Sequence, residues 1–531
     1  MTQTNIERHI YIMNTFKLFG LPLLAALALA CSGKKNESVK PSTGTTDSIV
    51  AQQQETPAIL AMLPDTAYES ASLLKYTIDR YATECDSIIE NLNSLYNNAS
   101  GVLTFRGTPD RQARFGGKVT GRPDTIIVDW SFRTNSTPPD SLENKWGGGT
   151  GWTGQPLYIK WPDSIKTGNG CKEEIIVGSL CHYLYFIDYQ TGKASRDTIN
   201  VSNPIKGTVS MDPTLNGNLY VGQGVPEKRP FGHMVIDIDK GEIAKFIPED
   251  RNAMRYWSAF DSSPVRVGQF LFWPGENGSL YKYLCADNDL IPHSVLRYTR
   301  SGSAPGMETS MAVYRNYGYT GDNHGNIVCT NLNTMRPVWC FDNSDDTDAS
   351  IVVDEENGKP YVYTCCEVDR RDSAYAYFRK LDALNGNLIW EAAFNSRKTY
   401  VGSKSFDGGF YASPLLGIGN CSDLIFTNCV NNLNGSDGDF VAINRHNGEI
   451  IYRTRLNHYA WSSPVAFLNE KNEMFIFTAD TSGYVYIING IDGEIIFSQL
   501  VGLNFESSPV VVGNSIVVGS RGNTIFKMSI K

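Results

Sequence analysis

The chain has 531 residues and a net charge of −9, from 47 lysines and arginines against 56 aspartates and glutamates. Charged residues make up 19% of it, below the ~25% of an average soluble protein, while 48 glycines and 11% aromatic residues fit turn-rich β-structure. No basic cluster follows Arg133, so the charge pattern argues against a nucleic acid as the partner.

Residues 1–31 are predicted to be a targeting segment rather than part of the fold. Lys17 supplies a positive charge ahead of a 13-residue apolar run, 18–30, which is too short to cross a bilayer comfortably. The segment ends Ala-Leu-Ala-Cys and resembles a bacterial lipoprotein signal with Cys31 as the lipidated residue; an ordinary signal peptide with a chance cysteine is the alternative. Because Ser32 follows and no acidic run comes after it, we expect a lipid anchor in the outer membrane, facing the periplasm.

Residues 32–60 have too few large apolar side chains to offset the entropy of ordering them, so we expect a flexible tether. The next segment, 61–103, is predicted to contain an amphipathic helix, because apolar residues recur at alternating steps of three and four. This helix would pack on the flank of the domain, or would pair as a coiled coil. Its apolar stripe consists of Ala71, Leu74, Ile78, Tyr81, Cys85, Ile88, Leu92 and Leu95.

Residues 104–117 carry the motif Phe-Arg-Gly-x-x-x-Arg, from Phe105 to Arg111. A separate segment, 125–133, is rich in β-branched and aromatic residues and contains Trp130. Its composition predicts a strand.

A four-residue motif, clearest as Ser-Ser-Pro-Val, then returns at steps of 40 to 63 residues. A repeat of this period indicates an array or a propeller. The proline positions of the eight copies are 156, 213, 264, 311, 351, 414, 464 and 509, with methionine at 311 and isoleucine at 351.

Most copies are followed by an Asx-x-x-x-Gly turn, as in 382–386 and 489–493. The Asx side chain bonds the backbone ahead of it, and glycine takes a positive φ without a Cβ clash. Segments on both sides, such as 475–478 and 484–488, are β-branched and aromatic. Each unit therefore predicts a four-stranded antiparallel blade, and eight units predict an all-β, eight-bladed β-propeller over 104–531.

The pattern Ser-Ser-Pro-Val, Gly-x-apolar-Tyr and Asp-Ala-x-x-Gly-x-x-x-Trp resembles the quinoprotein-type propeller repeat, named for pyrroloquinoline quinone (PQQ). In that family the aromatic residue that ends each unit docks between neighbouring blades, which implies this role for Trp130, Trp339 and Trp390. The Phe-Arg-Gly motif resembles a lead-in found before the propeller in many such chains. Because the final unit stops before its own last strand, we expect 125–133 to complete it and close the ring.

The innermost strands of all blades should turn their entry loops toward one face of the ring. The residues three before the proline positions would then form a rim rich in carboxylates and aromatic rings. Such a rim suits a cationic or peptide ligand, or a sugar stacked on a ring; solvated loop ends are the alternative. Gathered carboxylates should raise some pKa values unless a cation binds. The expected rim consists of Asp261, Glu308, Asp348, Tyr411, Trp461 and Glu506, with Thr153 and Ser210 completing the circle.

Ten cysteines follow Cys31, and a periplasmic location permits disulfides. Cys171 with Cys181, and Cys329 with Cys340, flank predicted turns. Each of these two sets is either a cross-strand disulfide or two free buried thiols.

The quinoprotein resemblance makes PQQ with calcium the alternative to our expectation of no cofactor. PQQ-dependent dehydrogenases carry a vicinal disulfide beneath the cofactor, and Cys365-Cys366 is the only adjacent cysteine pair here. We favour two neighbours on opposite faces of one strand, because the pair occurs late in the ring and no matching calcium and cofactor set is present. Since hydrolase and phosphate-loop motifs are also absent from the sequence, no catalytic, cofactor-binding or metal residue is predicted.

The sequence therefore predicts a non-enzymatic scaffold or binding propeller of the cell envelope, similar to the propeller lipoprotein of the outer-membrane barrel-assembly machinery. Expected partners are envelope proteins, outer-membrane assembly components among them, and the membrane itself through the lipid anchor. A PQQ-dependent oxidoreductase and a glycan- or peptide-binding module are the alternatives.

Overall fold

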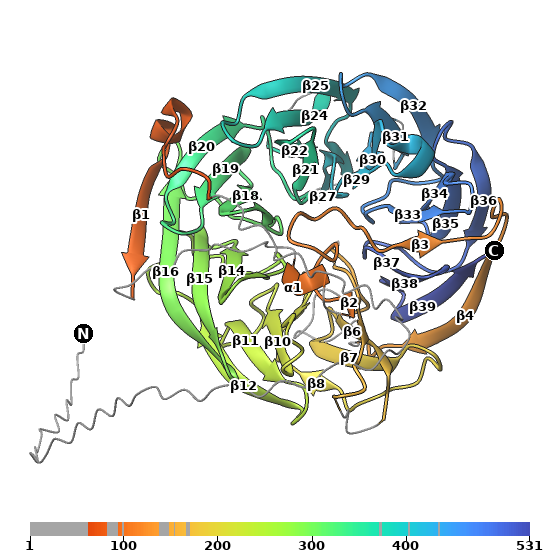
Figure 1. Cartoon of the computed structure of the whole chain (residues 1–531), viewed down its shortest axis with the longest axis horizontal. Helices are drawn as coiled ribbons and strands as arrows, with labels where there is room; N and C mark the ends of the chain where they lie inside the picture. Colours follow the sequence, from red (N-terminus) through yellow and green to blue (C-terminus); the bar gives the residue numbers. More distant parts are fainter. Residues whose placement is uncertain are drawn as a thin grey trace, which may run out of the picture. The chain divides into compact units, whose positions relative to one another are not determined.

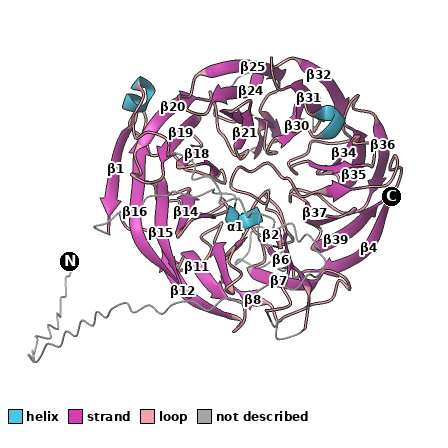
Figure 2. Cartoon of the chain, in the orientation of Figure 1, coloured by secondary structure: helices cyan, strands magenta, loops and turns pink. Residues whose placement is uncertain are grey.

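The computed structural model describes residues 62–81, 94–97, 100–136, 148–152, 154–165, 170–370, 374–401, 404–433 and 436–531. The predicted signal with Cys31 and the predicted tether lie outside these residues. Within them the chain forms a ring of eight antiparallel sheets (Figure 1), almost entirely of strands and connecting loops (Figure 2). No helix in this part of the chain is long and apolar enough to cross a membrane.

The first four blades follow one another in the sequence, each as a four-stranded antiparallel meander. Their strands are β5 (Leu157–Lys160), β6 (Glu173–Gly178), β7 (Tyr183–Asp188) and β8 (Ile199–Asn200) in blade 1; β9 (Ser210–Met211), β10 (Asn218–Gly222), β11 (Gly232–Asp237) and β12 (Glu242–Pro248) in blade 2; β13 (Val265–Val267), β14 (Phe270–Gly275), β15 (Ser279–Ala286) and β16 (Asp289–Thr299) in blade 3; and β17 (Ala312–Tyr314), β18 (Tyr317–Gly321), β19 (Asn326–Asn331) and β20 (Pro337–Asp342) in blade 4.

The last four blades continue this order, so the predicted eight-bladed propeller is confirmed. Their strands are β21 (Val352–Glu356), β22 (Lys359–Cys365), β24 (Tyr375–Asp382) and β25 (Leu388–Asn395) in blade 5; β28 (Gly408–Gly409), β29 (Leu415–Leu416), β30 (Leu424–Val430), β31 (Gly438–Asn444) and β32 (Ile450–Arg455), with β23 (Glu367–Val368) on the edge, in blade 6; β33 (Val465–Leu468), β34 (Met474–Ala479), β35 (Tyr484–Asn489) and β36 (Ile495–Leu500) in blade 7; and β37 (Val510–Val512), β38 (Ser515–Ser520), β39 (Thr524–Ile530) and β4 (Ile126–Arg133) in blade 8.

The ring is closed by β4, which lies ahead of all the other blade strands in sequence but forms the outer strand of blade 8. It pairs antiparallel with β39 along its whole length, from Ile126 opposite Ile530 to Arg133 opposite Thr524. The hydroxyl of Ser529 also donates to Asp129 Oδ2 at 2.6 Å. The segment predicted to clasp the ring, 125–133, therefore lies beside the C-terminal strands.

The predicted amphipathic helix is wrong for the part of it that can be described. Glu69–Leu73 form a 3-10 turn (η1), and Lys75–Arg80 form strand β1, which adds to the outer edge of blade 3 through β16. Within the described residues of this segment, Ser94–Asn97 (α1) alone are α-helical. A step of four equals two strand periods, so Leu74 and Ile78 share one face of a strand as readily as one face of a helix. Both pack against the blade core. Cys85, Ile88 and Leu92 of the predicted stripe lie outside the described residues.

Further N-terminal segments are attached to the ring at widely separated points. Strand β2 (Gly101–Val102) pairs with β5 of blade 1, and β3 (Gly117–Lys118) pairs in parallel with β33 of blade 7. The lead-in between them crosses the centre of the ring (Figure 1). The segment from 101 to 118 is therefore built into the propeller rather than appended to it.

The three predicted docking tryptophans lie between blades, each against the Asx-Gly turn of the next blade. Their indole N–H groups donate to the carbonyl of the residue after the Asx, at 2.9 to 3.0 Å. The turn glycine lies against the ring: a Cβ on Gly386, whose φ is +76°, would lie 2.7 Å from Trp339. Thus the Asx-x-x-x-Gly spacing serves the neighbouring blade as well as its own turn. The donor and acceptor pairs are Trp130 with Tyr189, Trp339 with Ala383, and Trp390 with Arg445.

A series of hydrogen bonds between neighbouring blades explains why most units have a serine before the proline position. In blades 3 to 7 the backbone N–H of this serine donates to the hydroxyl of the corresponding serine in the next blade, at 2.8 to 3.2 Å. In blade 8 it donates to the Gly154 carbonyl of blade 1. Each buried N–H at the ring centre is thereby paired. The serines are Ser263, Ser310, Ser350, Ser413, Ser463 and Ser508.

No disulfide joins the cysteines of the described residues, so the disulfide interpretation of the two candidate sets is wrong. Cys329 lies opposite Trp339 in the ladder, while Cys340 lies opposite Val328. Neighbouring residues of a strand point to opposite faces, so the two thiols face different cores. Cys365 and Cys366 are likewise buried and unbridged within blade 5.

Candidate functional site

Two buried arginines of the lead-in close one end of the ring axis. The Arg106 guanidinium donates to the carbonyls of Pro464 and Pro414, at 3.2 and 2.6 Å. Arg111 donates to the carbonyls of Met311 and Ser263, at 2.9 and 3.3 Å. These four carbonyls belong to blades 7, 6, 4 and 3 and lie at or next to the proline positions. The Phe-Arg-Gly-x-x-x-Arg motif therefore forms a base that ties four blades together.

Beyond this base, most of the predicted rim residues and several neighbours are arranged in a circle that we call the mouth cluster. It runs from the Trp152 ring to the Lys206 ammonium, through a series of carboxylates, to Tyr411 and Trp461, and back to Trp152. The carboxylates are Asp261, Glu276, Glu308, Asp346, Asp348 and Glu367.

Five of the predicted rim residues belong to this cluster: Asp261, Glu308, Asp348, Tyr411 and Trp461. Glu506 instead forms an ion pair with Arg521 at 3.1 Å and accepts from the Asn504 side chain. Ser210 donates to the Leu103 carbonyl, and Thr153 lies outside the described residues. The offset of three residues from the proline position thus identifies residues at the rim. It does not show which of the rim carboxylates are paired with a cation.

Five members of the cluster were not predicted from the sequence, among them Trp152, which lies four residues before the first proline position. Glu276 lies in the turn after β14, Glu367 begins β23, and Asp346 precedes a rim residue by two positions. Lys206 comes from the loop between blades 1 and 2. These positions have no common offset from the repeat, so only the folded ring shows that they meet.

The first half of the carboxylate series encloses the Lys206 ammonium. The carboxylate oxygens of Asp261, Glu276 and Glu308 lie within 4.8 Å of one another. Lys206 forms an ion pair with Asp261 and lies 4.3 Å from the centre of the Trp152 ring. Burial alone would lower the pKa of Lys206, but the three carboxylates raise it above its usual value. The ammonium is therefore held in its charged form.

The second half of the series consists of Asp346, Asp348 and Glu367, whose carboxylate oxygens also lie within 4.8 Å of one another. Burial, followed by repulsion from neighbouring carboxylates, raises the pKa of all three well above the usual range. Glu367 is 3% exposed, and its Oε1 has no hydrogen-bond partner among the described residues. Like charges at this separation cost free energy unless a cation or protons neutralise them.

Aromatic rings form the wall that joins the two halves. Tyr411 stacks on Trp461 with ring centres 4.8 Å apart, and Trp461 meets Trp152 edge to face at 5.4 Å. The Tyr411 hydroxyl lies close enough to Glu367 to affect the pKa of its carboxyl. Trp461, Asp346 and Asp348 are half-buried, so part of the cluster is exposed to solvent. A wall of ring faces beside carboxylates is the arrangement that binds organic cations.

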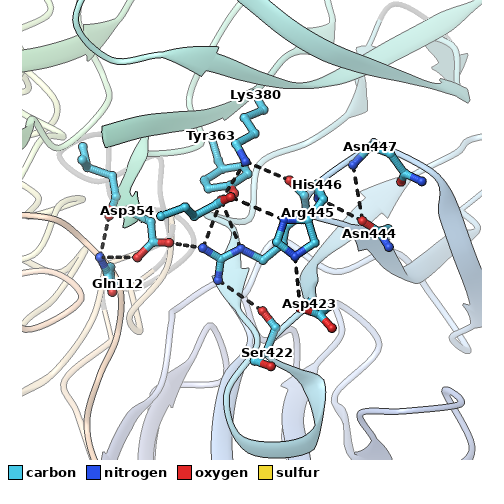
Figure 3. Close-up of polar contacts among 12 residues, drawn as sticks. Gln112, Asp354, Tyr363, Lys380, Ser422, Asp423, Asn444, Arg445, His446 and Asn447 are labelled. Atoms are coloured by element: carbon cyan, nitrogen blue, oxygen red, sulfur yellow. Dashed lines mark hydrogen bonds and ion pairs between the residues drawn. The ribbon is translucent and has the colours of Figure 1, made fainter. Parts of the chain in front are cut away.

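A second polar network, around Arg445, differs from the mouth cluster in that its charges are balanced (Figure 3). Arg445 forms ion pairs with Asp354 and with Glu356, the latter at 3.1 Å, and Lys380 approaches Glu356 to 2.7 Å. Gln112 of the lead-in donates to Asp354 at 3.3 Å. Because each carboxylate here has a cation, we assign this network to holding blades 5 and 6 and the lead-in together.

The mouth cluster does not fit PQQ. This quinone carries three carboxylates, so a pocket for it requires cations, whereas the cluster supplies six carboxylates and one ammonium that Asp261 already pairs. Cys365 and Cys366 are free and buried rather than bridged beneath the mouth. A trianionic ligand would meet net repulsion here.

Comparison with known proteins supports the fold. No protein-family model and no curated protein matches the sequence. A europium-containing methanol dehydrogenase matches with a TM-score of 0.59 and 11% identity, over 82% of this chain and 99% of that one. The quinohemoprotein alcohol dehydrogenase from Comamonas testosteroni matches with a TM-score of 0.59 and 12% identity, over 82% of each chain. BamB from Moraxella catarrhalis matches with a TM-score of 0.49 and 14% identity, over 76% of this chain and 100% of that one. The chain thus has the PQQ-like eight-bladed propeller fold, and at these identities the likeness extends to the fold alone.

Proposed function

We propose that this protein is a non-enzymatic binding propeller of the cell envelope, and that the mouth cluster binds a cationic ligand. The observation that carries the proposal is the closed circle of six carboxylates and three aromatic rings above a base sealed by the lead-in. Such a circle offers negative charge and ring faces to a ligand, and it repels anions.

The test is titration calorimetry of the full chain with a basic peptide, tri-lysine amide, against an acidic one, tri-glutamate amide. We expect the basic peptide alone to bind. Trp461→Ala should weaken binding at least tenfold, since it removes the centre of the aromatic wall. Tyr256→Ala is the matched control, because Tyr256 is 90% exposed and lies outside the cluster. If neither the peptide nor a simple cation such as calcium binds, the proposed function is wrong.

The envelope location is part of the same proposal and rests on Cys31 and the apolar run before it. Cys31→Ser should abolish labelling by radioactive palmitate and move the protein from the membrane to the soluble fraction. Affinity capture from detergent-solubilised membranes, with Cys31→Ser alongside, tests whether outer-membrane assembly components are partners. Labelling that survives the substitution would refute the anchor.

The competing function is a PQQ-dependent oxidoreductase, which the fold alone favours. Loading the full chain with PQQ and calcium should produce neither bound-quinone absorbance nor dye-linked alcohol oxidation, because the donor set of the mouth opposes an anionic quinone. Either signal would replace our proposal.

A further inference from the structure

The mouth cluster contains its own example of how an ammonium group is bound. Lys206 forms an ion pair with Asp261, one of three neighbouring carboxylates, and lies over the Trp152 ring at 4.3 Å from the ring centre. Its partner carboxylate, on Asp261, is 3% exposed. Carboxylates supply charge and hydrogen-bond acceptors, and the ring face supplies a cation–π contact. The chemistry that suits an ammonium here is therefore known from the molecule itself.

The other half of the cluster repeats that composition. Asp346, Asp348 and Glu367 are three carboxylates within one 4.8 Å group, and the ring of Tyr411 is joined to them through Glu367. Trp461, stacked on Tyr411, continues to Trp152. Both halves thus share one aromatic wall.

The two halves differ in whether the chain supplies the cation. Among the described residues, no lysine or arginine forms an ion pair with Asp346, Asp348 or Glu367. The nearby Lys398 is held by Asp369 and by Asp407, the latter at 2.8 Å. Oε1 of Glu367 and Oδ1 of both aspartates also lack hydrogen-bond partners in this part of the chain. Buried acceptors of this kind require partners.

We propose that Asp346, Asp348 and Glu367 bind the primary ammonium group of a ligand, a lysine-type side chain or another alkylamine, as the first three carboxylates bind Lys206. This inference rests on the proposed function and specifies its ligand. Three acceptor carboxylates match the three N–H donors of an ammonium. Calcium takes only oxygen ligands, so the ring faces of the aromatic wall would contribute nothing to a calcium site. The free amine and the lysine of a protein share this chemistry, and the experiment separates them.

The test is calorimetry of the full chain with Nα-acetyl-lysine methylamide, its Nε-acetylated form, Nα-acetyl-arginine methylamide and n-butylamine. We expect the lysine derivative to bind with a stoichiometry of one and the Nε-acetylated form to bind at least tenfold more weakly. Comparable binding of n-butylamine would indicate a free amine as the ligand, and weaker binding would indicate a lysine in a peptide. Asp348→Asn and Glu367→Gln should each weaken lysine binding at least tenfold. Asp423→Asn, at a side chain that is 76% exposed, should leave it unchanged.

Lys206→Met gives a readout that a general charge effect would not produce. Removing the internal ammonium makes the first three carboxylates available, so the stoichiometry should rise from one to two while circular dichroism stays unchanged. If this variant does not fold, the two carboxylate variants still decide the matter.

The failure of this inference differs from failure of the proposed function. One outcome is that no primary amine binds, whereas calcium or the arginine derivative binds and Asp348→Asn abolishes that binding. This outcome would overturn the ammonium assignment but leave the proposal that the mouth cluster binds cations intact. Equal binding of the acetylated and free lysine derivatives would also overturn it. If no cation of any kind binds, both proposals are wrong.

Discussion

Replacing Arg106 with alanine tests whether the lead-in is the structural base of the ring. Its guanidinium donates three hydrogen bonds, to the carbonyls of Pro464, Pro414 and Arg111. A buried carbonyl that loses its donor costs about 1–3 kcal/mol. Water can enter the space that the side chain leaves and partly satisfy the carbonyls, so we take the lower value for each and expect a loss of about 3 kcal/mol.

For a ring of about 430 residues (104–531), the unfolding entropy is on the order of 0.9 kcal/mol/K, so the melting temperature should fall by about 3 °C. Differential scanning calorimetry measures this shift. Arg114→Ala is the matched control, because that side chain is 64% exposed in the same segment and meets Asp354 only at 3.5 Å. Surface pairs of this kind contribute about 0–1 kcal/mol. Equal melting temperatures for the two variants would refute the structural role of Arg106.

Three further predictions concern the blades and the mouth. Gly386→Ala should destabilise the protein by about 1–3 kcal/mol more than Gly358→Ala. Both glycines have φ near +77°, but of the two only a Cβ on Gly386 would meet another residue, the Trp339 ring. Equal losses of stability in urea unfolding would refute the interblade contact. Arg445→Met should lower the free energy of unfolding by about 3–5 kcal/mol. The control Arg455→Met should lower it by less than about 1 kcal/mol, because the Arg455 side chain is 52% exposed beside its own two carboxylates. The reverse order would be incompatible with the network in Figure 3. Asp348→Asn should stabilise the ligand-free protein by about 1–3 kcal/mol at pH 8 and have little effect at pH 4. A raised carboxyl pKa contributes stability that is present below the unfolded value and lost as the pH rises through the folded one, so a variant that is stabilised at pH 4 alone would contradict the assignment.

The sequence predicts the ring because the repeat has a physical reason at each of its positions. The serine before the proline forms the circle of interblade hydrogen bonds, and the glycine of the Asx turn makes room for a tryptophan such as Trp390. Trp130 marks the closing strand for the same reason. Because these signals recur in several units, the ring can be predicted from the sequence alone.

The parts that the sequence does not predict depend on contacts between distant segments. Leu74 and Ile78 fit a helix and a strand equally, and only the open edge of β16 selects the strand. Lys206, Glu276 and Glu367 reach the mouth from loops at unrelated offsets. Glu506 is paired with Arg521, which lies 15 residues later in the sequence.

The clasp between β4 and β39 makes the chain topologically equivalent to a circle, since residues 400 positions apart lie side by side. A single proteolytic nick in a loop between two blades would therefore leave both fragments associated, because each remains bound to the other at two junctions. It follows that a nick between blades 6 and 7 should leave two fragments that co-purify. A variant that lacks β4 should not keep the ring closed, because β39 would lose its outer partner.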